Sequence, residues 1–410
     1  MNHQLSARKV GKADWRLPAP QPLDSRASRS DRRAGAFFMV AVAGVLVLAC
    51  ILALESELAL AGTLVAAGGL WWWGLRAGII AEAGAFSDRR PWAARLVVAG
   101  AATVLLIAFH GEHYALLMIS TVLLFAAACA GINIQTGLTG LANFAGAAFF
   151  ACGGYTLAVL AKSTALPHFL AILAGGVVAA AIGAVLLLPV LRTRGYYSAL
   201  VTIAFGILCS SFLQVNEQLG GAQGLQVPPL TILGWDMGSG FEVAGREVSF
   251  YFAYGLLALA VFLLSSLVAH AIEWSAIGVN LDATRSDELV GSTFGINPQR
   301  WKITAFLLGN FLIGIAGAVY AGLTNFVSPA GATFEQSLLL ISIVILGGIG
   351  NSWGSLIAAV LVILLPEKLH SLQEYRVLIF SVFVVAVLLF RPKGLVPRRM
   401  RDFSVMEKRP

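Results

Sequence analysis

The chain has 410 residues, of which 58% are hydrophobic and only 12% are charged, and its mean hydropathy is +0.82. An ordinary globular domain has about twice this charged fraction, so the composition excludes a soluble protein. The apolar residues fall into repeated blocks of about 16 to 23 residues, each long enough to cross a hydrocarbon core of ~30 Å as a helix.

The formal net charge of +7 could suit a nucleic-acid-binding protein, but the Lys and Arg residues lie in the two tails and in loops between apolar blocks. The positive-inside rule concentrates basic residues in the cytoplasmic segments of membrane proteins. The basic clusters that end at Arg33 and begin at Arg391 therefore predict that both termini are cytoplasmic. Membrane topology accounts for the charge, and we expect no nucleic-acid partner.

Residues 1–34 are polar, rich in Arg, Ser and Pro, and contain no apolar run, which predicts a disordered cytoplasmic tail. The first apolar block, 35–54, is too long for the apolar region of a signal peptide and lacks a small-residue cleavage site. We expect it to remain in the membrane as a signal anchor.

The whole pattern predicts an all-α polytopic membrane protein with about 10 to 12 transmembrane helices. Spans are expected near 35–54, 58–80, 94–110, 114–132, 147–162, 168–190, 198–215, 249–270, 303–323, 336–349, 354–370 and 375–390. Glycine is dense around 132–150 and 345–354, so these segments should be broken or re-entrant. Small residues at helix-face spacing, such as Gly176 with Gly183 and Gly309 with Gly314 and Gly317, should let helix backbones pack closely.

Several kinds of chemistry have no support in the sequence. It contains no phosphate-binding loop of the type G-x-x-x-x-G-K-[ST], so the chain should not hydrolyse ATP by itself. His110 and His113 lie at the end of a span with no third ligand, which argues against a metal site. The four cysteines lie within or beside apolar blocks, where they pack as small hydrophobic residues. We therefore expect no metal, no cofactor and no catalytic residues.

The segment 275–302 is polar and compatible with a helix, and it joins two strong spans. A connector of this length in a compact bundle is usually functional. Its charged residues should form a solvated helical face, and two glycines should end the helix: Asp282, Arg285, Asp287 and Glu288, then Gly291 and Gly295. By alternation of the spans this segment is cytoplasmic, whereas 216–248 lies outside.

At this segment the sequence resembles the branched-chain amino acid ABC permeases of the LivH/LivM family, and the LivM-type subunit in particular. The resemblance runs in order through seven stretches between about residue 115 and residue 400, and their order is more specific than any one of them. They are GLTGLANFAGAAFFACGGY from Gly137, RTRGYYSALVTIAFG from Arg192, GGAQGL from Gly220, the 275–302 loop, FVSPAGATF from Phe326, VILGGIGNSWG from Val344 and FRPKGL from Phe390.

The resemblance implies a permease core over 113–395, preceded by a three-span membrane extension over 35–112 and followed by a cytoplasmic tail over 396–410. It also implies a multi-pass protein of the bacterial inner membrane. Its partners would be a second, LivH-like permease forming a heterodimer, two cytoplasmic ATP-binding subunits and a periplasmic solute-binding protein. The 275–302 loop would then be the coupling helix that contacts the ATPase.

The chain departs from the family pattern at polar positions near the expected solute path. The family often has Gly-His at Ala145 and Gly146, Asp at Tyr196 and Glu at Ile207. A permease for urea or short amides therefore stays open beside one for branched-chain amino acids, as does an ATP-independent channel or facilitator. For solute contacts we select polar residues within spans or beside their ends, which tend to face a partner helix or a wet cavity: Thr139, Asn143, Thr202 and Asn310.

Overall fold

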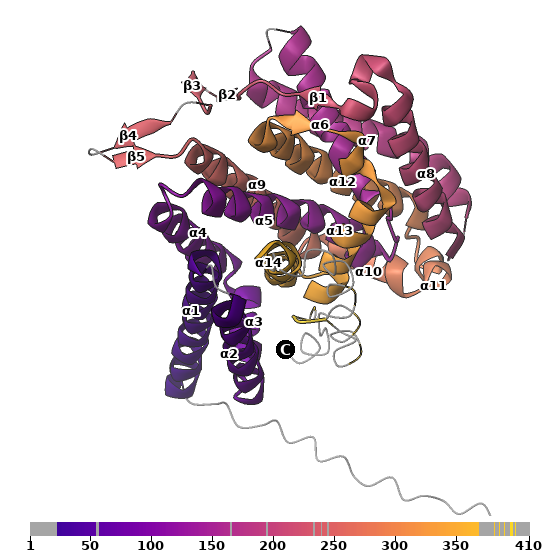
Figure 1. Cartoon of the computed structure of the whole chain (residues 1–410). Coiled ribbons are helices and arrows are strands. Elements are labelled where there is room, and N and C mark those ends of the chain that lie inside the picture. The colour runs from indigo at the N-terminus through magenta and orange to yellow at the C-terminus, as the bar shows by residue number, and fades with distance from the viewer. Residues whose placement is uncertain are drawn as a thin grey trace, which may run out of the picture.

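The computed structural model describes residues 23–368 except 55–56, 165, 194–195, 233, 239 and 244–245, together with Ser381, Val385, Leu389, residues 394–396 and Arg398. Seven helices of this part are long and apolar enough to cross a membrane. The predicted all-α polytopic membrane fold is thus confirmed (Figure 1).

The N-terminal region forms four helices: α1 (Leu23–Ala53), α2 (Glu57–Arg76), α3 (Ile79–Arg89) and α4 (Pro91–Ala108). Helix α1 begins within the segment predicted to be a disordered tail, so residues 23–34 are helical instead. No proline or glycine lies between Pro22 and Gly35, so the helix of the apolar block continues back to that proline. Residues 1–22 lie outside the described part of the chain.

The predicted span at 58–80 is divided in the structure. Helix α2 ends at Arg76, and α3 begins after Gly78, whose φ of 75° places it in the left-handed region. A residue in this region is a common helix stop, and glycine adopts it without strain. With 11 residues, α3 is too short to cross a bilayer.

The core helices follow the predicted spans closely up to residue 368. They are α5 (His113–Ile132), α6 (Gly146–Ser163), α7 (His168–Arg192), α8 (Tyr196–Val215), α9 (Tyr251–Glu273), α12 (Pro298–Thr324), α13 (Phe334–Gly347) and α14 (Ser352–Lys368). Of the last predicted span, 375–390, only Ser381, Val385 and Leu389 are described. Both glycine-dense segments interrupt the helices, at 140–145 and 348–351.

Helix α12 lies at the centre of the core and packs against α5, α6 and α7 (Figure 1). Glycines make this close approach possible. A Cβ atom on Gly317 would collide with the carbonyl oxygen of Phe150, and one on Gly314 would lie 2.6 Å from the Ala179 Cβ. The expected packing through small residues is therefore confirmed, because helix backbones meet where no side chain intervenes.

The two ends of the bundle differ in structure. At one end, short antiparallel strands and 3-10 turns connect the helices: β1 (Leu225–Gln226) with β6 (Phe326–Val327), β2 (Thr231–Ile232) with β3 (Trp235–Asp236), β4 (Phe241–Val243) with β5 (Arg246–Val248), and η2 (Glu217–Leu219), η3 (Gly221–Gln223) and η4 (Pro329–Ala332). At the other end lie α10 (Ala276–Ser286) and α11 (Glu288–Thr293). We call these the strand end and the α10–α11 end; they lie at opposite ends of α9 and α12 (Figure 1).

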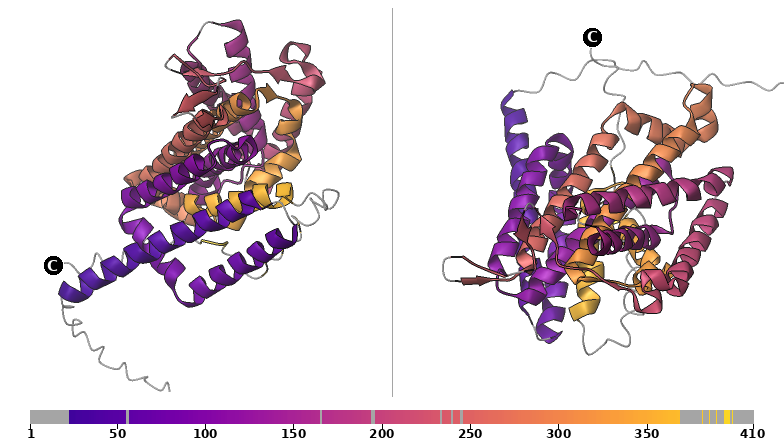
Figure 2. Two further views of the ribbon diagram at one scale, coloured as in Figure 1. Left: turned by 60° about the vertical axis from the view of Figure 1, so that its left-hand side comes forward. Right: turned by 90° about the horizontal axis from the view of Figure 1, so that it is seen from above.

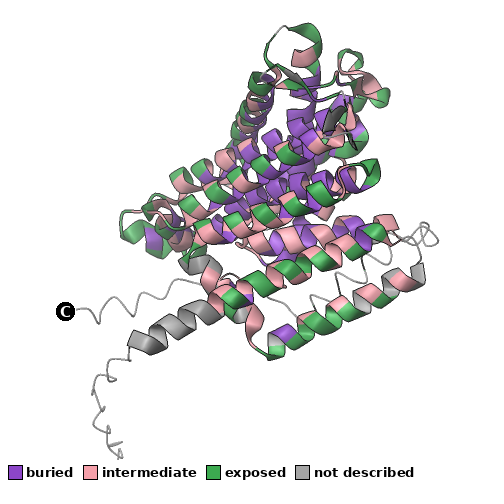
Figure 3. Cartoon of the chain, turned by 90° about the vertical axis from the view of Figure 1, so that its left-hand side faces the viewer, coloured by how far each residue is buried: buried purple, intermediate pink, exposed green. Residues whose placement is uncertain are grey.

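The N-terminal region lies beside the core rather than within it (Figure 2). Helix α4 packs on α9, where Leu106 is fully buried and Arg95 Nη2 donates to the Ser266 carbonyl at 3.3 Å. Lys368 Nζ donates to the Leu52 carbonyl at 2.9 Å, which holds the end of α1 to the end of α14. Buried residues concentrate in the core helices, whereas α1 to α3 are largely exposed or intermediate (Figure 3).

Candidate functional site

Three carboxamide side chains meet in the interior of the core. Gln135 Nε2 donates to Asn310 Oδ1 at 2.8 Å, and Asn143 Nδ2 donates to Gln135 Oε1 at 2.7 Å and to Asn310 Oδ1 at 3.3 Å. None of the three exposes any surface. We call Gln135, Asn143 and Asn310 the carboxamide cluster. Two of its members were selected from the sequence, and the structure brings them into contact.

Gln135 was missed by the sequence analysis. It lies in η1 (Asn133–Leu138), a π-helical turn that continues α5 directly. Its Nε2 also donates to the Phe306 carbonyl at 3.0 Å, so it connects two points on α12. Its place in the sequence could have identified it, since Gln135 lies directly after a strongly apolar span. A polar side chain at membrane depth requires a hydrogen-bond partner.

The chain folds into this arrangement because the helix is interrupted after η1. Single π-turns often mark functional positions in helices. The segment 140–145 then continues without regular structure and is largely buried, so its backbone groups need side-chain partners. Asn143 Oδ1 accepts from Ala145 N at 2.9 Å, and Ser337 Oγ accepts from Ala147 N at 3.2 Å, which satisfies the start of α6.

Thr139 and Thr202 are the other two residues predicted to contact the solute. Their hydroxyl groups form hydrogen bonds with backbone groups. The Thr139 hydroxyl donates to the Gln135 carbonyl and accepts from Leu141 N. The Thr202 hydroxyl donates to the Ala199 carbonyl and accepts from Phe144 N at 3.1 Å. Thr202 therefore ties α8 to the irregular segment, and in the isolated chain both threonines are buried.

Asn310 keeps one polar group without a hydrogen bond in the described part of the chain. Its Nδ2 is buried and has no partner, while its Oδ1 accepts two bonds. A Cβ on Gly183 of α7 would collide with this nitrogen, so the amide is pressed against a helix backbone. A buried amide without a hydrogen bond lowers the stability of the fold. Asn310 is therefore the member of the cluster whose Nδ2 is available to donate a hydrogen bond.

The predicted coupling segment folds into α10 and α11, where Arg285, Asp287 and Glu288 are exposed as predicted and Asp282 is partly exposed. Asp282 accepts two hydrogen bonds from Arg398, at 2.7 and 3.0 Å. Arg285 is exposed, yet its Nη1 donates to the Gly137 carbonyl in η1. Asp282 and Arg285 therefore form hydrogen bonds with segments that are distant in the sequence, which their spacing alone did not predict.

Burial lowers the pKa of the Arg285 guanidinium, and the nearby Arg398 charge acts in the same direction while Asp282 opposes both. An arginine nevertheless remains protonated in proteins. Arg285 is therefore a permanent cation that contacts the backbone of the same turn that carries Gln135.

The remaining predicted residues of this segment have structural roles. Asp287 caps α11, since its Oδ1 accepts from Leu289 N at 2.8 Å and Val290 N at 3.1 Å, and Glu288 pairs with Lys302 of α12. Gly291 does not end the helix as predicted but lies inside α11. Gly295, with a φ of 80°, ends it: Ile296 N donates to the Gly291 carbonyl at 3.2 Å and Gly295 N to the Ser292 carbonyl at 3.0 Å, the pattern of a Schellman cap.

Apolar side chains project from α11 and the turn after it. Leu289 is 76% exposed and Phe294 is 81% exposed, and Val290 lies beside them at 51%. We call these three residues the apolar tip. Large apolar side chains grouped on a polar surface typically mark a site of protein contact.

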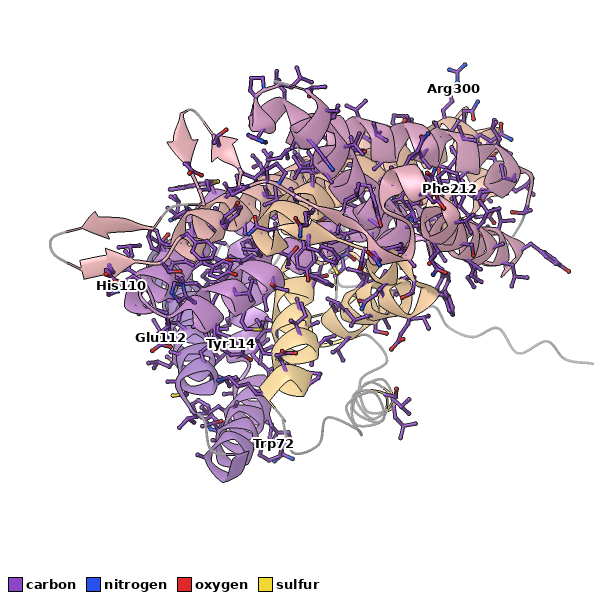
Figure 4. All side chains as sticks on the ribbon, turned by 45° about the horizontal axis from the view of Figure 1, so that its top comes forward. Trp72, His110, Glu112, Tyr114, Phe212 and Arg300 are labelled. Carbon is purple, nitrogen blue, oxygen red and sulfur yellow. The ribbon has the colours of Figure 1, made fainter. Side chains whose placement is uncertain are left out.

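The two histidines near the strand end make hydrogen bonds within the chain. His113 Nδ1 hydrogen-bonds Ser249 Oγ at 2.6 Å, and His110 Nδ1 donates to the Ile107 carbonyl at 3.0 Å. His110 and Glu112 lie near β4 and β5, at the opposite end of the molecule from Arg300 (Figure 4). Among the described residues no group of three or more potential ligands could hold a metal ion, and all four cysteines are free thiols.

Comparison with known proteins agrees with this geometry. A family model described as "Branched-chain amino acid transport system / permease component" matches residues 112–391. The chain belongs to this family of permease components. The match begins at the start of α5, so α1 to α4 precede the segment that defines the family.

Named permeases from enterobacteria are similar over the same region. The high-affinity branched-chain amino acid transport system permease protein LivM of Escherichia coli is 33% identical over 285 residues, or 65% of this chain, and that of Salmonella typhimurium is 34% identical over the same share. The similarity spans 66% of the length of each, just under two thirds. The corresponding LivH protein of Salmonella typhimurium is 23% identical over 67% of this chain and 91% of its own length. No solved structure gives a significant match.

Proposed function

We propose that this chain is one permease half of an ATP-driven importer for branched-chain or related amino acids. It would pair with a second, LivH-like permease, two cytoplasmic ATP-binding subunits and a periplasmic solute-binding protein. Membership of the permease family and the similarity to LivM support the substrate class.

The observation that carries this proposal is the connection between the α10–α11 end and the carboxamide cluster. Arg285 of α10 binds the Gly137 carbonyl, and Gln135 of the same π-turn binds Asn143 and Asn310. A displacement of α10 would therefore act on the turn that carries Gln135. A permease of this kind switches between two packed conformations, and a partner drives the switch by shifting their relative stability.

The apolar tip is the surface that would contact the ATPase. Leu289, Val290 and Phe294 are exposed at one end of the molecule, whereas the charges of Asp282, Asp287 and Glu288 are engaged within the chain. Buried apolar anchors dominate the energy of protein interfaces. We therefore propose that the apolar tip provides most of the binding energy for the ATPase, and that Arg285 passes the displacement of α10 to η1.

The sidedness follows from the same assignment. If the α10–α11 end is cytoplasmic, the alternation of α9 and α12 places the strand end in the periplasm, where a binding protein would dock. The N-terminus of α1 and Arg398, near the C-terminal end of the described part of the chain, would then be cytoplasmic, as the positive-inside rule predicts. Cysteine labelling from each side at Phe294 and at Gln218, which are both exposed, tests this sidedness.

We propose that the N-terminal extension stabilises the core at the outer face of α9. Its contacts support this role: Leu106 is fully buried against the core, and the ends of α1 and α14 are joined through Lys368. Helix α3 is too short to span the bilayer, whereas α1 and α4 are long and apolar enough to cross it.

Uptake by the reconstituted complex is the decisive experiment. In proteoliposomes with both permeases, both ATPases and the binding protein, labelled leucine should accumulate only with ATP and the binding protein. Competition by unlabelled isoleucine and valine, but not by urea or acetamide, would establish the substrate class. Displacement by urea or acetamide would assign the chain to amide transport, and uptake by this chain alone would make it a facilitator.

A further inference from the structure

The described part of the C-terminal segment returns to the α10–α11 end of the core. Leu395 N donates to the Leu346 carbonyl at 2.8 Å, and Val396 N donates to the Gly347 carbonyl at 3.0 Å. Asn351 Nδ2 donates to the Val396 carbonyl at 3.2 Å. Leu395 and Val396 are therefore held against the turn between α13 and α14.

Arg398 extends this contact to α9 and α10. Its Nε donates to Glu273 Oε1 at 2.7 Å, its Nη1 to Asp282 Oδ1 at 2.7 Å, and its Nη2 to Asp282 Oδ2 at 3.0 Å. The Arg398 side chain is only 9% exposed. Such a fork between a guanidinium and a carboxylate fixes direction as well as distance, so α10 is held in one orientation relative to the end of α9.

Glycine makes room for this arginine. Gly350 has a φ of 90°, and a Cβ there would lie 2.6 Å from Arg398 Cδ. A Cβ on Gly137 would in turn lie 2.6 Å from the Gly350 Cα. The arginine stem, the α13–α14 turn and the π-turn η1 are therefore in direct contact, with no side chain between them.

These contacts close a ring around the base of α10. On one side, Arg285 holds the Gly137 carbonyl; on the other, Asp282 holds Arg398. Asn133 closes the ring, because its Oδ1 accepts from Gly350 N at 2.8 Å. Two arginines and two carboxylates, Asp282 and Glu273, balance in formal charge, which allows the group to be partly buried.

Charge and burial act in opposite directions on the arginine itself. Burial alone would lower the pKa of Arg398, but the hydrogen bonds and charges of Asp282 and Glu273 raise it above the ordinary value. The guanidinium is thus a fixed cation at every physiological pH, and the contact is permanent rather than switched by pH.

We propose that Arg398 is a positioning residue that latches α10 to the core, so that residues 394–396 and Arg398 form part of the coupling device rather than a plain tail. The latch makes α10, η1 and the α13–α14 turn move as one body when an ATPase displaces the apolar tip. This inference rests on the proposed function for its biological meaning, but the mechanical contact can be tested without any partner.

The first test measures amide hydrogen exchange in the purified permease without ATPase. In Arg398→Ala, amides of α10 and of residues 347–351 should exchange about tenfold faster or more than in the wild type. The matched control is Arg300→Ala, which removes the same charge from an exposed arginine at the start of α12 (Figure 4). Equal protection in Arg398→Ala and wild type would overturn the latch and leave the proposed function untouched.

The second test measures coupling in the reconstituted complex. In Arg398→Ala the amount of leucine taken up per ATP hydrolysed should fall about tenfold, while Arg300→Ala should match the wild type. A normal ratio in a variant with loosened α10 would overturn the latch as a coupling element. If the wild-type complex itself takes up no leucine with ATP, the proposed function fails instead.

A milder variant keeps the test decisive if Arg398→Ala does not fold. Asp282→Asn removes the carboxylate charge but leaves Arg398 bound to Glu273, so the protein should fold with α10 partly loosened. The exchange rate of the α10 amides in Asp282→Asn should lie between the rates in the wild type and in Arg398→Ala. If Arg398→Ala does not fold, the rate in Asp282→Asn should still be higher than in the wild type. Wild-type exchange and a wild-type uptake ratio in Asp282→Asn would overturn the proposal.

Discussion

Arg285 in α10 donates a hydrogen bond to the carbonyl oxygen of Gly137, in the π-turn that also carries Gln135. The two residues are far apart in the sequence, yet this single contact places the polar connector next to the interior cluster. A backbone carbonyl is released in a π-turn because the regular i to i−4 pattern is disturbed there. Arg285 therefore satisfies a group that the interrupted helix leaves without a regular partner.

The first prediction concerns this contact. Arg285→Ala should reduce leucine uptake per ATP hydrolysed, because α10 no longer pulls on η1. Arg285→Lys should retain part of the coupling, since an ammonium can still reach a carbonyl but not with the same planar fork. Uptake and phosphate release measured in the same proteoliposomes check this, and a full uptake ratio in Arg285→Ala would show that η1 is driven by another contact.

The second prediction concerns the carboxamide cluster. Gln135→Ala should lower the free energy of unfolding by about 1–3 kcal/mol, because Asn143 and Asn310 each lose a buried hydrogen bond. The measurement is thermal unfolding of the detergent-purified permease. Gln214→Ala, the same change at an exposed position of α8, should shift stability by less than about 0.5 kcal/mol. Equal melting of both variants would show that the cluster is not a stabilising network.

The third prediction uses a natural pair of thiols. Cys152 of α6 and Cys209 of α8 lie with their sulfur atoms 3.9 Å apart, close enough for copper phenanthroline to oxidise them to a disulfide after a small adjustment. If α8 moves relative to α6 during transport, the oxidised permease should lose leucine uptake and regain it with dithiothreitol. Cys209→Ala should be insensitive to the oxidant. Efficient cross-linking with unchanged uptake would show that α6 and α8 move together.

The fourth prediction concerns the apolar tip. Replacing Leu289 or Phe294 by Ala should weaken binding of the ATP-binding subunit by about 1–2 kcal/mol each, as expected for anchors of an interface. Co-purification and titration with the isolated ATPase check this. Val215→Ala at the strand end of α8, which is 81% exposed, is the matched apolar control. A tip variant that binds like this control would exclude the tip from the interface.

The fifth prediction concerns the contact between the extension and the core. A Cβ on Gly255 of α9 would lie 2.6 Å from Leu106 Cδ2 of α4, so Gly255→Ala should destabilise the protein by about 1–3 kcal/mol through overpacking. Leu106→Ala should cost about 2–5 kcal/mol by leaving a cavity. The double variant should be more stable than the sum of the two losses predicts. Strict additivity in thermal unfolding would show that α4 does not press on α9 at this point.

The spans were predictable because hydropathy is local. A run of apolar residues needs no information from elsewhere in the chain to favour a helix in lipid, and so the helices from α4 to α14 lie where the sequence placed them. The start of α1 was misplaced because the polar residues there are compatible with both helix and loop, and the break between α2 and α3 was missed because it depends on one glycine, Gly78, in the left-handed region. The length of the polar connector likewise predicts a functional segment, which stays a prediction.

The partners of polar residues were not predictable in the same way. The sequence requires that Asn143, Asn310 and Asp282 be satisfied, since unpaired groups in the interior are costly, but it does not say by which residue. The answers, Gln135 and Arg398, come from segments that meet only after the helices pack. Composition and hydropathy by themselves determined a multi-pass membrane bundle, and the tertiary structure decided how its polar groups link the α10–α11 end to the interior, because hydrogen-bond partners are selected by proximity in space.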